Sequence, residues 1–251
     1  MNGETVGRLG SLAVRPRTLV VLLAAGVACG GSTGAGKSPA DTAGIKPAAV
    51  ATRSRSDSAP TTTAPDSARR TILFLGTSLT AGLGLEPDSA YPQQIQRRID
   101  SARLPYQVVN AGVSGETSAG LLRRLDWVLQ RPADVIVVET GANDGLRGQP
   151  VPDTRATIGQ ILDRIKAERP KARVALVQME APTNLGVQYT TAFHAMFPAL
   201  AREHGVTLLP FLLDRVAGKP ELNQPDGVHP NYVGERIVTE NVWKALEPVL
   251  R

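Results

Sequence analysis

The stretch Thr71-Ile-Leu-Phe-Leu-Gly-Thr-Ser-Leu-Thr-Ala-Gly82 joins a continuous apolar run to a polar, glycine-containing turn. Such a run is typical of a strand that is buried on both faces of a parallel sheet. Four more short apolar runs follow, at residues 106–112, 134–141, 173–179 and 206–210. Helical stretches separate them, near residues 91–103, 118–130, 153–168, 188–204 and 232–250. Strands that alternate with helices in this way predict an open α/β sheet with right-handed crossovers.

Composition and charge are those of an ordinary soluble globular protein. The 251 residues are 42% hydrophobic and 20% charged, which excludes collagen, a coiled coil and a polytopic membrane protein. Residues 1–71 carry nine basic and four acidic residues, so the whole net charge of +5 lies there. The remaining 180 residues carry nineteen of each sign. Because the main part of the chain is neutral, its charge does not indicate a nucleic-acid partner.

The N-terminal residues are typical of an export signal. Three arginines precede an apolar run of 11 residues at positions 18–28. At about 1.5 Å per residue this run is too short to cross a hydrocarbon core of about 30 Å. Residues 1–28 therefore predict a secretory signal peptide, and Cys29 directly after it resembles the lipidated cysteine of a bacterial lipoprotein. We expect a periplasmic or cell-surface protein, anchored at Cys29; plain secretion and a misread start are the alternatives.

The next segment is dominated by small and polar residues. Of the 41 residues at positions 30–70, 30 are Ala, Gly, Ser, Thr or Pro. Such a stretch buries too little apolar surface to offset its conformational entropy. Residues 29–70 are therefore predicted to be a disordered linker, and the folded domain is predicted to span residues 71–251.

Few residues are available for metal or redox chemistry. Cys29 is the one cysteine in the chain, which excludes intrachain disulfides and a cysteine-rich zinc site. The three histidines, His194, His204 and His229, lie far apart without a second ligand cluster, so no metal site is expected. The turn after the first run has neither a P-loop lysine nor the third glycine of a dinucleotide loop, so no nucleotide cofactor is expected.

Polar and small residues follow the predicted strands, where α/β sheets form their sites. Ser78 follows the first strand, Gly112 ends the second, and Asn143 lies in Gly141-Ala-Asn-Asp144 after the third. Each alone has an ordinary structural interpretation: helix N-cap, turn glycine and turn brace. Asp226 precedes His229 by three residues, a spacing at which a carboxylate can fix an imidazole tautomer.

Taken together and in this order, these blocks resemble the SGNH (GDSL) hydrolase superfamily, in its bacterial thioesterase I, lysophospholipase and arylesterase branch. The resemblance covers residues 72–251 and implies a three-layer α/β/α, flavodoxin-like fold with a five-stranded parallel sheet. It implies acyl transfer with Ser78 as nucleophile, His229 as general base and Asp226 as its partner. It places the oxyanion hole at the Ser78 and Gly112 backbone N–H groups and the Asn143 side chain.

The resemblance also sets expectations for the substrate. It implies a small-molecule ester or lipid substrate, with Leu146 and Pro182 along an acyl groove. No cofactor is expected, and a monomer is expected because nothing in the sequence marks an interface. Two residues depart from the family pattern: Thr77 stands where the family has aspartate, and Ala142 stands where a glycine is frequent. A carbohydrate O-acetyl esterase with the same triad, and a non-catalytic surface-binding lipoprotein, are the alternative hypotheses.

Overall fold

The computed structural model describes residues 69–251. The predicted signal peptide, Cys29 and all but the end of the predicted linker lie outside this range. Within the described range, the first strand begins at Arg70, one residue before the predicted domain boundary. Two contacts explain the difference: the Arg70 backbone N–H donates to Pro105 O at 2.8 Å, and its guanidinium lies 4.3 Å from the centre of the Tyr106 ring.

A parallel five-stranded sheet in the order β2-β1-β3-β4-β5 forms the centre of the domain. Its strands are β1 (Arg70–Gly76), β2 (Tyr106–Gly112), β3 (Val135–Val138), β4 (Arg173–Val177) and β5 (Thr207–Leu209). The register pairs Gly76 of β1 with Gly112 of β2, and Leu75 with Val138 of β3. The carboxyl ends of these three neighbouring strands therefore lie side by side.

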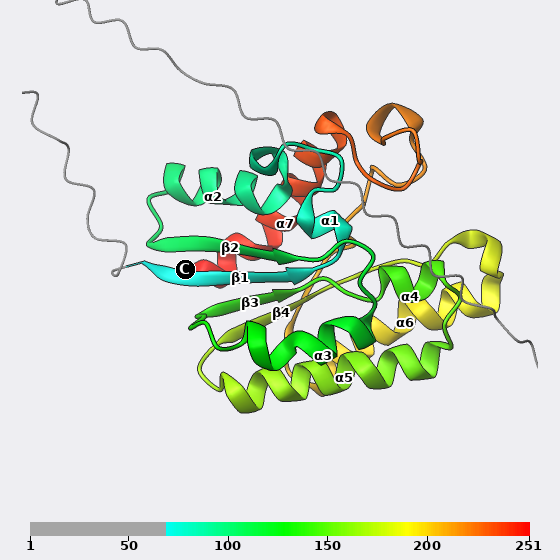
Figure 1. Cartoon of the computed structure of the whole chain (residues 1–251), viewed down its shortest axis with the longest axis horizontal. Coiled ribbons are helices and arrows are strands. Elements are labelled where there is room, and N and C mark those ends of the chain that lie inside the picture. The colour runs from blue at the N-terminus through cyan, green and yellow to red at the C-terminus, as the bar shows by residue number, and fades with distance from the viewer. Residues whose placement is uncertain (1–68) are drawn as a thin grey trace, which may run out of the picture. The chain divides into compact units, whose positions relative to one another are not determined.

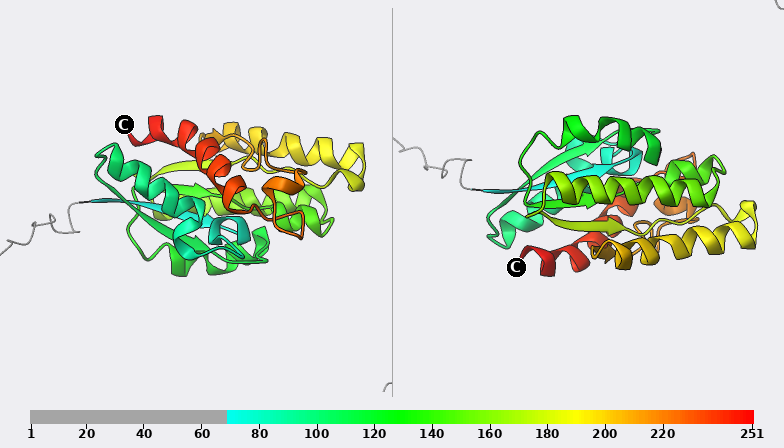
Figure 2. Two further views of the ribbon diagram at one scale, coloured as in Figure 1. Left: turned by 90° about the horizontal axis from the view of Figure 1, so that it is seen from above. Right: turned by 90° about the horizontal axis from the view of Figure 1, so that it is seen from below.

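Helices cover both faces of the sheet, as Figures 1 and 2 show. On one face α2 packs against α7, and on the other α5 lies between α3 and α6. The bounds are α2 (Tyr91–Ser101), α3 (Ser118–Val128), α5 (Val151–Glu168), α6 (Val187–Glu203) and α7 (Tyr232–Leu250). Two short helices, α1 (Ser78–Ala81) and α4 (Ala142–Leu146), follow β1 and β3 directly, and the 3₁₀ turns are η2 (Pro87–Ser89), η3 (Thr183–Leu185) and η4 (Pro220–Leu222). This three-layer arrangement confirms the predicted fold class.

The core explains why the central strands read as continuous apolar runs. Residues 72–75 of β1 and 135–138 of β3 are at most 1% exposed, because helices cover both sides of each strand. Within residues 69–251, no helix combines the length and the apolar character that crossing a bilayer requires.

Candidate active site

Ser78 begins the short helix that follows β1. Thr77 is the N-cap of α1 in an extended conformation, and its side chain accepts from the backbone N–H of Leu79. Ser78 is the first helical residue and is 7% exposed. The strand-to-helix turn therefore places the Ser78 hydroxyl at the carboxyl end of the sheet, as the sequence predicts.

The loop between η4 and α7 carries Asp226 and His229. Asp226 Oδ1 accepts the backbone N–H groups of Val228 at 2.9 Å and His229 at 3.0 Å. The Gln224 backbone N–H donates to His229 O at 2.7 Å, and Asn231 caps the start of α7. These bonds fix the backbone of the loop that carries the histidine.

Three side chains form a hydrogen-bonded chain at this point. His229 Nε2 lies 2.8 Å from Ser78 Oγ, and His229 Nδ1 lies 2.6 Å from Asp226 Oδ2. The backbone N–H of His229 is the main cause that lowers the pKa of Asp226 to about 2, with contributions from the imidazole and the Val228 N–H. Asp226 therefore remains a carboxylate that accepts from the Nδ1 side of the ring.

Asn143 enters the same site from α4. Its Nδ2 donates to Glu116 O at 3.0 Å, which uses one of the two amide hydrogens. The neighbouring Asp144 is buried and accepts from Ser118 N at 2.8 Å and from Ser118 Oγ at 2.6 Å, so it ties α4 to the start of α3. This arrangement fixes Asn143 beside Ser78 and His229 in one cavity of about 190 Å³.

The structure corrects the expectation for Gly112. Its backbone N–H donates to Asn110 Oδ1 at 2.9 Å and is not free for a substrate. A Cβ at Gly112 would lie 2.4 Å from Ala81 N, so the glycine allows α1 to pack against β2. The glycine that lines the cavity is Gly115, three residues later, at φ +77°. Both glycines follow the same strand, and only the turn geometry distinguishes them.

An apolar cavity of about 490 Å³ adjoins the catalytic one. The two share Leu79, Ala142, Leu146 and Val228 in their walls. Leu146 lines both cavities and Pro182 lines the apolar one, where the sequence places them. Sequence reasoning missed other wall residues, because they belong to distant segments: Met179, Phe211, Leu213 and Ala217.

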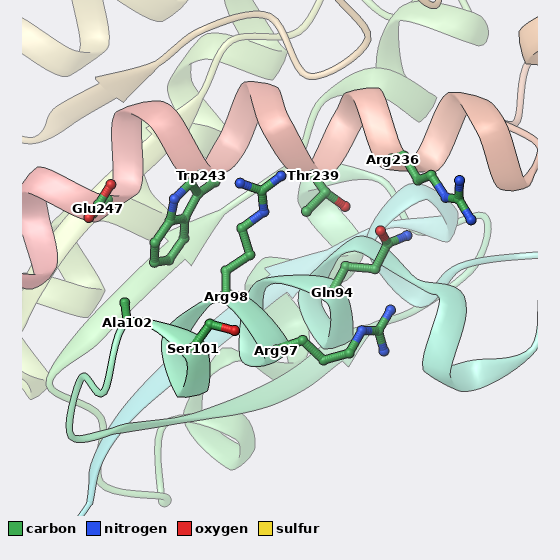
Figure 3. A pocket seen from close by; sticks show the side chains of 9 residues that line it. All are labelled: Gln94, Arg97, Arg98, Ser101, Ala102, Arg236, Thr239, Trp243 and Glu247. Atoms are coloured by element: carbon green, nitrogen blue, oxygen red, sulfur yellow. The ribbon is translucent and has the colours of Figure 1, made fainter.

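A larger hollow of about 810 Å³ lies between α2 and α7 (Figure 3). Its lining residues include Arg97, Arg98, Arg236 and Trp243. Arg98 pairs with Glu240 at 2.5 Å. None of the three linked side chains lines this hollow, so it is separate from the candidate site.

The other two histidines lie elsewhere. His194 pairs with Glu180 at 2.7 Å, and His204 pairs with Asp163 at 2.8 Å. Over residues 69–251 no group of three or more His, Cys, Asp and Glu side chains could hold a metal ion. Of the three histidines, His229 is the one that contacts the Ser78 hydroxyl.

The three-layer α/β/α fold and this serine–histidine–aspartate arrangement are typical of a serine hydrolase that acts on acyl groups. The chain belongs to the GDSL-like Lipase/Acylhydrolase family, whose family model matches residues 74–237. It is 37% identical over 185 residues to the esterase TesA of Pseudomonas aeruginosa, covering 73% of this chain and 90% of that protein.

Two further comparisons agree with this assignment. The Escherichia coli K12 thioesterase 1/protease 1/lysophospholipase L1 is 39% identical over 181 residues, covering 72% of this chain and 85% of that protein. A crystal structure of TesA superposes with a TM-score of 0.69 at 35% identity, covering 72% of this chain and 99% of the other. The chain is thus a carboxylic ester hydrolase of this family.

Proposed function

We propose that Ser78, His229 and Asp226 carry out ester hydrolysis through an acyl-enzyme. The observation that supports this is the 2.8 Å contact of His229 Nε2 with Ser78 Oγ, with Asp226 2.6 Å from Nδ1. Ser78 Oγ attacks the carbonyl carbon while His229 Nε2 takes the hydroxyl proton. The tetrahedral intermediate then releases the alcohol, which receives that proton. Water attacks the acyl-enzyme by the same route and frees the carboxylic acid and Ser78.

The donors that would stabilise the oxyanion are the backbone N–H groups of Ser78 and Gly115 and the amide of Asn143. Gly115 replaces Gly112 in this role, because Gly112 N–H is already bonded to Asn110. Ser78, Gly115 and Asn143 all line the catalytic cavity with His229. Donors fixed in this way stabilise charge that develops on the carbonyl oxygen in the transition state.

The natural substrate is proposed to be an ester or lysolipid with an apolar acyl chain. The apolar cavity of about 490 Å³ adjoins the catalytic one, with Leu146 in the walls of both, and offers room for more than an acetyl group. The names of the relatives, an esterase and a thioesterase and lysophospholipase, support the same substrate class.

A chain-length series tests this proposal. The full chain is assayed on p-nitrophenyl acetate, butyrate and octanoate and on acetylated sugars, beside Ser78→Ala. Each buried methylene contributes about 0.8 kcal/mol, so kcat/KM for octanoate should exceed that for acetate by at least about tenfold. A preference for acetylated sugars would favour the deacetylase alternative, and no turnover by folded wild type would favour a binding protein.

A substitution in the wall of the cavity refines the test. Leu146→Ala should lower kcat/KM for octanoate by about tenfold and leave acetate nearly unchanged. Val187→Ala is the matched control, because Val187 is 82% exposed and lies outside the cavity walls. Equal losses on both esters would place the acyl chain elsewhere.

We further propose that the chain is exported, lipid-anchored at Cys29 and monomeric. Support comes from the arginines, the apolar run at residues 18–28 and the small residues before Cys29. Labelled palmitate supplied to producing bacteria should enter the wild-type chain and not Cys29→Ser. Equal labelling of both would contradict lipidation at this cysteine. Light scattering of Cys29→Ser, purified without detergent, would test the oligomeric state.

A further inference from the structure

Glu139 is a fully buried carboxyl group that the proposed reaction does not use. It follows β3 directly and is 0% exposed. Its Oε2 accepts the backbone N–H of Thr77 at 2.7 Å. The Thr77 hydroxyl lies 2.9 and 3.0 Å from its two oxygens, and the Thr80 hydroxyl lies 3.0 Å from Oε2. A buried group of this kind is costly unless such partners satisfy it.

All of these donors belong to the turn that carries Ser78. Thr77 directly precedes the serine, and Thr80 follows it by two residues. The carboxyl group therefore binds α1 at residues before and after Ser78. The end of β1 is shaped around the same contact. A Cβ at Gly76 would lie 2.7 Å from Glu139 Oε2 and 2.0 Å from Thr80 Oγ1. Glycine at this position therefore makes room for the carboxyl group and its threonine partner.

The hydrogen-bond pattern favours an ionised Glu139. A backbone N–H can only donate, so Glu139 Oε2 accepts from Thr77 N; the Thr77 hydroxyl accepts from Leu79 N and has its one hydrogen available for Glu139. Tyr91 OH lies 2.8 Å from Thr80 Oγ1 and can donate to it, which leaves the Thr80 hydrogen for the carboxylate. Burial is the largest influence and raises the pKa of Glu139 above its ordinary value, although the hydrogen bonds from Thr77 and Thr80 oppose this shift.

We propose that Glu139 is a positioning residue: a buried carboxylate that holds the Ser78 turn in its reactive geometry through Thr77 and Thr80. This rests on the proposed function, because the turn matters only if Ser78 is the nucleophile. Thr77 is suited to bind this carboxylate. Its hydroxyl accepts from Leu79 N and donates to Glu139, whereas an ionised aspartate there could only accept. Two facing carboxylates would repel or share a proton, and threonine avoids both.

The first test replaces the carboxylate by its neutral isostere. Glu139→Gln should lower kcat for p-nitrophenyl butyrate by about 10- to 100-fold. The reason is that a displacement of the Ser78 hydroxyl by about 1 Å lowers the rate by up to about 100-fold. KM should change by less than about twofold, because the acyl cavity is not touched. A kcat within about twofold of wild type in the folded variant would overturn the proposal.

Glu235→Gln is the matched control. Glu235 is also buried, at 2% exposed, but it accepts the Tyr91 N–H at 2.7 Å and makes no hydrogen bond to the Ser78 turn. An amide oxygen can accept the same bond, so kcat at pH 7 should remain within about twofold. An equal loss of kcat in both variants would indicate a general effect of altering a buried glutamate and would overturn the proposal.

A second pair of variants tests the link if Glu139→Gln fails to fold. Thr77→Val removes the hydroxyl with little change in shape, and Thr77→Ser retains it. The proposal expects kcat to fall by about tenfold in Thr77→Val and to be restored to within about threefold in Thr77→Ser, with KM nearly constant in both. Equal kcat in the valine and serine variants would contradict the role of this hydrogen bond.

Ser78→Ala separates this proposal from the one on which it rests. If Ser78→Ala retains wild-type turnover, the nucleophile assignment fails, and the positioning role fails with it. If Ser78→Ala is inactive while Glu139→Gln and Thr77→Val keep full kcat, the nucleophile assignment stands and the positioning role alone is wrong.

Discussion

Asn143 combines a structural and a proposed chemical role in one side chain. One amide hydrogen bonds to Glu116 O at 3.0 Å, and the other is available to a substrate oxygen. Removing one oxyanion donor typically costs about 10² to 10³ in kcat. Asn143→Ala should therefore lose that much activity with KM and the circular dichroism spectrum nearly unchanged. A loss below about fivefold would exclude Asn143 from the oxyanion hole.

Glu235 should make stability depend on pH. Burial raises its pKa to about 8, so the folded state holds a proton that the unfolded state releases above about pH 4.5. Wild-type stability should thus fall as pH rises through this window, by up to about 1.4 kcal/mol per unit. Glu235→Gln has no titrating carboxyl group at this position, so it lacks this pH dependence of stability. Urea denaturation should show its advantage over wild type growing between pH 5 and pH 8; a constant difference would contradict the buried proton.

Some residues of the candidate site could be identified from the sequence, and others could not. Ser78, Asp226 and His229 could be proposed because the blocks that contain them, taken together and in order, resemble the SGNH hydrolase superfamily; each block alone had an ordinary structural interpretation. Gly112 and Gly115 could not be distinguished, because which N–H faces the cavity depends on the turn after β2. Glu139 gave no signal, since a carboxylate at the end of an apolar run does not reveal that two threonines satisfy it.

At the scale of elements, the long periodic segments were predictable and the short ones were not. The bounds of β2 (Tyr106–Gly112) and α7 (Tyr232–Leu250) match their predicted ranges. The third strand was predicted to continue to residue 141 but ends at Val138. The next residue, Glu139, accepts a hydrogen bond from Thr77 N in the Ser78 turn. The helices α1 and α4 span four and five residues, too few for an apolar period to show in the sequence. Both nonetheless carry residues of the candidate site.

The packing of α1 against β2 requires a glycine at position 112. A Cβ there would lie 2.4 Å from Ala81 N and 2.9 Å from Thr77 O, and backbone atoms cannot move aside cheaply. Gly112→Ala should therefore lose about 1–3 kcal/mol of unfolding free energy, measured in urea. Gly159→Ala is the control: it lies inside α5 with its nearest neighbour at 3.4 Å, and helix propensity favours alanine. Equal stability changes would contradict the close packing of α1.

At the scale of the whole molecule, the site depends on the complete fold. Ser78 and His229 are 151 residues apart in the chain, and the sheet and α7 bring them to one edge. β1 runs from Arg70 at one end of the sheet to the Ser78 turn at the other (Figure 1). Arg70 and the Ser78 turn therefore lie at opposite ends of β1.

Ser78 is the proposed nucleophile of this carboxylic ester hydrolase. The most direct measurement is the intact mass of the full chain after treatment with a p-nitrophenyl alkylphosphonate, followed by peptide mapping. The wild type should gain one phosphonyl group, mapped to Ser78, and lose its esterase activity in parallel. Ser78→Ala should gain none. A phosphonyl group that persists in Ser78→Ala, or that maps to another residue of the wild type, would contradict the account.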